Sequence, residues 1–174
     1  MAEFIAFTYK TFLSFQFSKR WMVAISYGFL CHVLFTISVL AMLVSMFFGM
    51  SQSFGKVPHP YSHFANLLLI IQFPLAHSFL LSSMGKKYLL YFSPKNYSLS
   101  LAPTVFVVLA SIQLFILFFF WTPTKIIIWQ ASGTSFFLMC SLYSLSWLLL
   151  IWATIDAGVE LQSGALGWMS LAQN

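Results

Sequence analysis

Charge is what this sequence has least of. Of its 174 residues only eleven carry a formal charge, eight of them basic and three acidic. Charged residues make up 6% of the chain, whereas soluble globular domains carry about 25%. With 60% hydrophobic residues beside so little charge, the composition excludes a soluble globular domain. We therefore expect the protein to reside in a lipid bilayer.

The few charged residues are spaced so that four long stretches contain none. These stretches are residues 21–55, 57–85, 96–124 and 126–155. Each is longer than the roughly 20 apolar residues that cross a hydrocarbon core about 30 Å thick. Because backbone groups in lipid must pair within their own segment, such stretches form helices. The sequence therefore predicts an all-α fold, a polytopic transmembrane bundle of four spans.

The expected organisation has three parts. Residues 1–20 alternate apolar side chains with Lys10, Lys19 and Arg20, which predicts an amphipathic lead-in at the membrane surface. A four-helix transmembrane domain over residues 21–155 and a cytoplasmic tail over residues 156–174 follow. The expected helices cover residues 22–49, 63–85, 101–121 and 134–155.

Proline and charge mark the expected breaks between helices. Pro103 predicts the start of the third helix, because proline fits a first helical turn. Residues 86–97, which contain Pro94, are expected to form a loop. A short amphipathic piece is expected around residues 126–130, after the break at Pro123.

The basic residues also predict an orientation. Six lie in the N-terminal flank and the second loop, and two lie in the first and third loops. Since cytoplasmic loops are enriched in Lys and Arg, we expect both termini in the cytoplasm. The two groups are Lys10, Lys19, Arg20, Lys86, Lys87 and Lys95 on one side, and Lys56 and Lys125 on the other.

Residue types that carry chemistry are scarce. Cys31 and Cys140 both fall inside expected spans, where thiols are packing residues more often than a disulfide. The chain contains no Gly-rich phosphate loop, zinc-type Cys/His spacing or Ser/His/Asp set. Its basic residues are scattered singly, which argues against nucleic acid as a partner. The expected partners are the lipid bilayer and other membrane-protein subunits.

The second expected helix is the most distinctive stretch, because it contains Asn66, Gln72, Pro74, His77 and Ser78. Polar side chains inside a span are costly and usually face the bundle interior. His77 lies one turn beyond the kink that Pro74 predicts. We interpret His77 as a hydrogen-bond partner of a neighbouring helix, and a ligand or proton carrier as the alternative. On the first interpretation, His77→Asn or His77→Gln should partly replace it.

The other histidines give weaker indications. His32, in the first helix, would face His77 if the two helices packed against each other, and two imidazoles are the minimum for a bis-histidine haem. His59 and His63 flank Pro60, where a solvated loop is the simpler interpretation than a metal site. The weak cofactor candidates are therefore His77 and His32, and we predict no metal ligands.

Asp156 and Glu160 are the acidic residues besides Glu3, and they lie at the end of the fourth helix. We interpret them as a solvated helix end. Because carboxylates are unfavourable at a helix C-terminus, a basic residue of the second loop is expected to neutralise them.

The order of several landmarks over residues 60–165 resembles a known family. The landmarks are Asn66, His77-Ser78, Lys86-Lys87, Trp121-x-Pro123, Trp129, Ser146-Trp147 and Gly158…Leu161-Gln162. This order resembles the N-terminal half of the bacterial methanethiol S-methyltransferases. These enzymes are similar to NnrU-like proteins and to the isoprenylcysteine carboxyl methyltransferase superfamily. The resemblance implies a bacterial inner membrane location and structural roles for Asn66, Pro74, His77, Ser78, Trp121, Pro123 and Trp129.

The resemblance does not extend to the cofactor. In that family the S-adenosylmethionine site is built by the C-terminal half, around an Arg-His-Pro-x-Tyr stretch that this sequence does not contain. We therefore expect no cofactor in the isolated chain, and S-adenosylmethionine only if a partner supplies the missing half. No catalytic residue is carried over.

Three functions follow from this reading. The first is a non-catalytic membrane subunit or scaffold within a larger complex. The second is half of a split small-thiol S-methyltransferase that depends on S-adenosylmethionine. The third is a haem- or pigment-binding membrane protein. The first agrees best with a chain that lacks catalytic residue sets.

Overall fold

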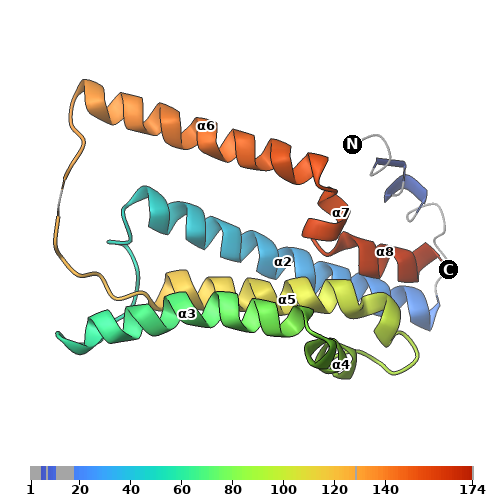
Figure 1. The fold of residues 1–174 in the computed structure, drawn as a ribbon. Coiled ribbons are helices and arrows are strands. Elements are labelled where there is room, and N and C mark those ends of the chain that lie inside the picture. Colours follow the sequence, from blue (N-terminus) through green and yellow to red (C-terminus); the bar gives the residue numbers. More distant parts are fainter. Residues whose placement is uncertain (1–4, 7, 11–17, 128, 174) are drawn as a thin grey trace.

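A computed structural model describes residues 5–6, 8–10, 18–127 and 129–173. This part of the chain contains helices and no strands. Four helices are long and apolar enough to cross a membrane. They are α2 (Lys19–Phe47), α3 (Tyr61–Leu81), α5 (Ser98–Phe120) and α6 (Thr134–Asp156), shown in Figure 1. The expected all-α bundle with four spans is confirmed, and the chain is a helical membrane protein.

Three shorter helices lie between residues 83 and 173: α4 (Ser83–Tyr91), α7 (Val159–Gln162) and α8 (Ala165–Gln173). Ser82 separates α3 from α4, and its extended backbone ends α3. Its side-chain oxygen accepts a hydrogen bond from Gly85 N (3.1 Å), which caps the start of α4. The loop expected over residues 86–97 is therefore partly helical.

Other boundaries also differ from expectation. α5 begins at Ser98, five residues before Pro103, and Leu101 N bonds to Tyr97 O (3.0 Å) in its first turn. Pro103 therefore lies inside the helix, and the prediction that it marks the start is wrong. α3 continues through Pro74 as one helix. The described residues around 126–130 are not helical. The predicted lead-in over residues 1–20 falls largely outside the described residues.

α5 is the central helix of the bundle, with α2 on one side and α3 on the other (Figure 1). α2 and α5 start at the same end, and α3 runs in the opposite direction. Ser38 of α2 faces α5, and its hydroxyl shares its single hydrogen between Ser111 O (2.7 Å) and Leu34 O of its own helix (2.6 Å). Small side chains allow helix backbones to approach closely in lipid.

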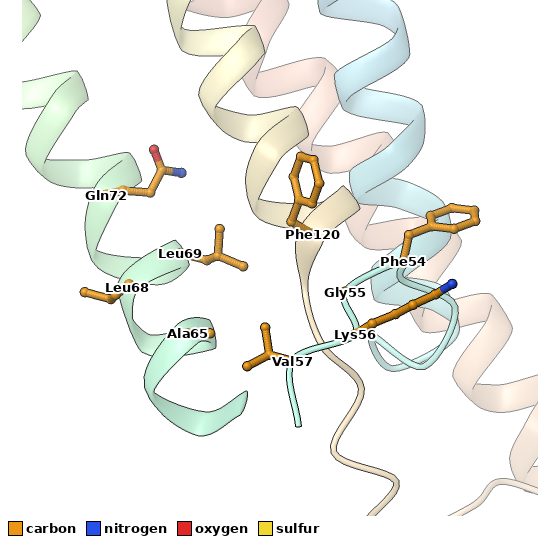
Figure 2. A pocket seen from close by; sticks show the side chains of 9 residues that line it. All are labelled: Phe54, Gly55, Lys56, Val57, Ala65, Leu68, Leu69, Gln72 and Phe120. Carbon is orange, nitrogen blue, oxygen red and sulfur yellow. The ribbon is translucent and has the colours of Figure 1, made fainter. Parts of the chain in front are cut away.

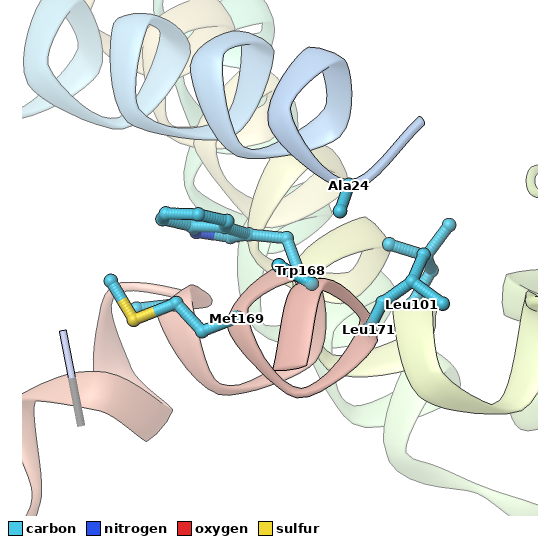
Figure 3. Packing of buried hydrophobic residues seen from close by; sticks show 7 residues of the cluster. Ala24, Leu101, Trp168, Met169 and Leu171 are labelled. Atoms are coloured by element: carbon cyan, nitrogen blue, oxygen red, sulfur yellow. The ribbon is translucent and has the colours of Figure 1, made fainter. Parts of the chain in front are cut away.

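α8 supplies much of the apolar core. Figure 3 shows Trp168 of α8 lying against α2, and Leu171 next to Leu101 of α5. The cluster consists of Ala24, Leu101, Ala165, Trp168, Met169, Leu171 and Ala172. Within the segment that the sequence predicts as a cytoplasmic tail, residues 156–174, the structure contains α7 and α8, and α8 packs against α2 and α5.

α6 stands apart from the other long helices, and Figure 1 shows it set off from α2, α3 and α5. None of its residues is buried. Its link to α2 is Tyr143, whose hydroxyl donates to Leu43 O (2.6 Å) and whose ring lies 5.5 Å from that of Phe47. Tyr143 therefore contacts α2 through both a hydrogen bond and its ring.

The bundle has two distinct ends. We call the end with residues 48–60 and 121–127 the loop end. We call the other the α8 end, where the start of α2, the end of α8 and α4 lie together (Figure 1).

Candidate functional site

Asn66 is the most fully engaged polar side chain at the loop end. Its amide nitrogen Nδ2 donates to Thr122 O (2.8 Å), and its Oδ1 accepts from Thr122 N (2.9 Å). Both residues are buried. α5 ends at Phe120, so the backbone of Thr122 has no helical partner, and the Asn66 amide takes its place. This residue pins the end of α5 to α3.

The segment of residues 54–57 is held against the same end of α5. Phe54 N donates to Phe119 O (2.9 Å), and Gly55 N donates to Trp121 O (3.0 Å). The rings of Phe54 and Phe119 are also stacked, with their centroids 4.8 Å apart. A Cβ at Gly55 would lie only 2.2 Å from Phe120 O. Only glycine therefore permits this close approach.

These contacts leave an open pocket of about 510 Å³ between α3 and the loop (Figure 2). Its walls are mainly apolar. Figure 2 shows Leu69 and Val57 projecting into the space between α3 and the loop, with Phe120 at the end of α5. The lining residues are Phe54, Gly55, Lys56, Val57, Ala65, Leu68, Leu69, Gln72 and Phe120. Lys56 is the charged residue among them.

His77 packs between aromatic rings. Its ring is stacked on Phe73 of α3 at 5.7 Å and meets Phe106 of α5 edge-on at 5.0 Å. Its Nδ1 is buried and has no hydrogen-bond partner in the described structure. His77 therefore contacts a neighbouring helix through its ring. Next to it, Ser78 is exposed.

His32 has a different partner. Trp168 Nε1 donates to His32 Nε2 (3.2 Å), and the two rings are perpendicular at 5.9 Å. Since an indole N–H can only donate, His32 Nε2 must be unprotonated. The structure thus brings His32 against α8 and His77 against α5, and no ring contact joins the two imidazoles in the described residues.

The remaining predicted site residues lie at the loop end. Trp121 is half-buried, and its carbonyl accepts the hydrogen bond from Gly55. Pro123 follows the clamped Thr122, and Trp129 is exposed. His59 and His63 are exposed, with rings 5.3 Å apart. Within the described residues, no group of three or more metal-ligating side chains occurs.

The junction of α2, α5 and α8 was not predicted from the sequence. Thr104 Oγ1 donates to Gly164 O (2.7 Å) and accepts from Trp168 N (3.0 Å). A Cβ at Gly28 would lie 2.6 Å from the Trp168 ring, so α8 packs directly on the backbone of α2. The available signal was the run of small residues in the last segment, which is typical of close helix packing in membranes.

This junction determines where Asp156 and Glu160 lie along the length of α2. A Cβ added at Gly164 would lie 2.9 Å from both Cys31 Sγ and Val107 Cβ. Gly164 is therefore packed near the middle of α2 and α5. Asp156 is also 13 residues beyond Tyr143, or about 20 Å of helix. Both carboxylates therefore lie alongside the middle of α2 and not beyond its end.

In the described structure neither carboxylate forms an ion pair or a hydrogen bond. Asp156 is exposed and Glu160 is half-buried. From the sequence, we expect a basic residue of the second loop to neutralise them. Lys86 and Lys87 lie instead on α4, which packs against α3 and α5. That expected neutralisation is not seen.

Comparisons with protein-family models, curated proteins and solved structures gave no match to this chain. The resemblance to the methanethiol S-methyltransferases stays a prediction.

Proposed function

We propose that this protein is a non-catalytic integral membrane subunit, a scaffold that packs within a larger membrane complex. In this proposal it resides in the bacterial inner membrane with both termini in the cytoplasm. It resembles the membrane half of a methyltransferase and performs no chemical step of its own.

The observation that carries the proposal is the isolation of α6. This helix is long and apolar enough to span a membrane, yet none of its residues is buried within the chain. Spans of polytopic proteins associate through close packing with their neighbours. The face opposite Tyr143, which includes Leu145 about 200° around the helix, has no partner helix in the described structure. A helix of another subunit would supply that packing.

Asp156 and Glu160 add a second reason. Ionisable residues within membrane spans almost always pair with another group or face a cavity. These two carboxylates lie level with the middle of α2 and have no basic partner in the described structure. A Lys or Arg of a partner subunit would neutralise them.

The test is purification of the tagged chain from its native membranes in a mild detergent. We expect a stoichiometric membrane protein to copurify. A photo-crosslinking residue at Leu145 should attach to that protein, whereas the same residue at Leu75, an exposed position on α3, should attach mainly to lipid. The double variant Asp156→Asn, Glu160→Gln should weaken the complex.

Two results would contradict the proposal. One is a chain that purifies alone and crosslinks only to lipid from Leu145. The other is a copurified partner that contains an Arg-His-Pro-x-Tyr stretch and, once assembled, transfers a methyl group from S-adenosylmethionine. That second result would establish the split enzyme.

A further inference from the structure

The short helix α4 lies across the end of the bundle and not along it. It connects the end of α3 to the loop before α5. In Figure 1 the long helices run across the view, whereas α4 is seen end-on at the α8 end. A helix that joins the ends of two membrane spans in this direction lies in the plane of the membrane surface, at the level of the lipid headgroups.

One side of α4 is packed against the bundle. Leu89 forms a buried cluster with Leu80 of α3 and Val105 of α5. Gly85 is one turn earlier and shares this side. It approaches α3 so closely that an added Cβ would overlap with Phe79 O. These contacts determine which residues of α4 face away from the bundle.

One flank of α4 is aromatic and apolar. The ring of Tyr88 lies 5.7 Å from that of Phe79, a residue of the span α3, so this flank faces the membrane-spanning part of the chain. Met84 and Tyr91 lie four residues before and three after Tyr88 and share its flank. They are 61% and 85% exposed. Side chains of this kind at a membrane surface contact the upper part of the acyl chains.

The remaining surface of α4 is basic. With 3.6 residues per turn, Lys86 points about 160° away from Tyr88, and Lys87 lies about 100° from Tyr88, opposite the packed side. Both lysines are exposed. Neither forms an ion pair with another described residue. Lys87 thus lies between the aromatic flank and the flank that carries Lys86, where a lipid phosphate would lie next to its acyl chains.

The α8 end as a whole carries one sign of charge in the described structure. The described acidic residues, Asp156 and Glu160, lie instead alongside the middle of α2. Groups of four to eight basic residues on an amphipathic helix or next to the end of a span bind anionic lipid headgroups. The basic residues at this end are Lys19 and Arg20 at the start of α2, Lys86 and Lys87 on α4, and Lys95 in the turn before α5.

We propose that α4 binds one anionic phospholipid, with the phosphate at Lys87 and Lys86 and the acyl chains beside Tyr88 and Met84. The inference is independent of the proposed subunit function, since it rests on the direction of α4, its two flanks and the charge around it. Neutral phospholipids share the acyl chains but lack the net negative charge, so they bind more weakly.

Native mass spectrometry of the purified protein with equimolar phosphatidylglycerol and phosphatidylcholine tests this proposal. We expect one phosphatidylglycerol to be retained about ten-fold more tightly than phosphatidylcholine. The double variant Lys86→Gln, Lys87→Gln should lower this preference to about two-fold. Lys56→Gln, Lys125→Gln removes the same charge at the loop end and should keep the preference. All four lysines are exposed, so these substitutions leave the fold intact.

A second pair of variants adds a negative charge. Tyr91→Glu places a carboxylate one turn from Lys87 and should also lower the preference for phosphatidylglycerol. Tyr61→Glu, at an exposed position of α3 at the loop end, adds the same charge and should behave as the unmodified chain. Equal retention of the two lipids by the unmodified chain, an equal effect of the two double lysine variants, an equal effect of the two glutamate variants, or displacement of the lipid by glycerol phosphate alone would each overturn the proposal.

Discussion

Asn66 joins α3 to the segment that follows α5 with one side chain. Its amide presents a donor and an acceptor side by side, as a backbone peptide does, and so matches both groups of Thr122. Both residues are buried, so water does not replace these bonds, and an unmade buried hydrogen bond costs about 1–3 kcal/mol. The polar residue of α3 that the sequence singled out thus has a structural partner 56 positions away.

The contacts of His77 predict which substitutions will replace it. The ring packs between Phe73 and Phe106, while its Nδ1 lacks a partner in the described residues. His77→Ala should therefore lower the thermal unfolding midpoint by about 5 °C, because aromatic packing is lost. His77→Phe should restore it, since the ring remains and the unpaired nitrogen is removed. Fluorescence-detected unfolding in detergent measures both.

Ser78→Ala, at the exposed neighbouring position, is the matched control and should leave the midpoint unchanged. The sequence interpretation expects rescue by His77→Asn or His77→Gln instead. If His77→Asn restores stability and His77→Phe does not, a hydrogen bond and not ring packing is the role of this residue.

At this scale the sequence pointed to Asn66 and His77 but not to the residues that they contact. A polar side chain in an apolar span is conspicuous, so Asn66 and His77 were found from composition alone. Their partners, Thr122 and Phe106, lie on other segments and follow from the three-dimensional packing of α3 on α5. No spacing rule connects positions so far apart in the chain.

Among the elements, α8 depends most on close approach. Gly28→Ala would put a methyl group 2.6 Å from the Trp168 ring, and overpacking of this kind costs about 1–3 kcal/mol. We expect α8 to loosen, with faster hydrogen exchange of the backbone of residues 165–173. Mass spectrometry of peptides from this segment, in detergent, gives the measurement.

Ser26→Ala, an exposed position on the same helix whose hydroxyl bonds only to its own helix at Met22 O, is the matched control. It should leave α8 protected. Equal exchange of residues 165–173 in Gly28→Ala and the unmodified chain would show that the Trp168 contact does not hold α8.

The long helices were predictable because a bilayer imposes one length and one composition on them. α8 was not predictable on the same grounds. It has only nine residues, too few to span, and its burial comes from contacts with Gly28, Thr104 and Leu101 on two other helices. The start of α5 was misplaced because Pro103 was assigned to the first turn, whereas Tyr97 and Leu101 already form one before it.

For the whole molecule, the side of the membrane on which each end lies stays a prediction. The start of α2, the end of α8 and the basic residues of α4 lie at the same end (Figure 1). In a Cys140→Ser background, we expect Gln52→Cys at the loop end to react with a membrane-impermeant thiol reagent in intact cells. Lys87→Cys on α4 should react only after lysis, because six basic residues favour the cytoplasm on that side.

Both positions are exposed in the structure, so a difference in labelling reports the side of the membrane and not burial. Labelling of Lys87→Cys in intact cells, with Gln52→Cys protected until lysis, would reverse the orientation.

The packing of α8 also has a consequence for biosynthesis. The core cluster joins Ala24, near the start of the first long helix, to Trp168, which the ribosome adds after all four long helices. Until that segment emerges, the groove beside Gly28 and Leu101 stays uncovered in the inserting chain. A nascent chain stalled before residue 165 would thus expose this apolar surface to membrane chaperones and proteases. The surface is buried only when α8 has been synthesised and has packed against α2 and α5.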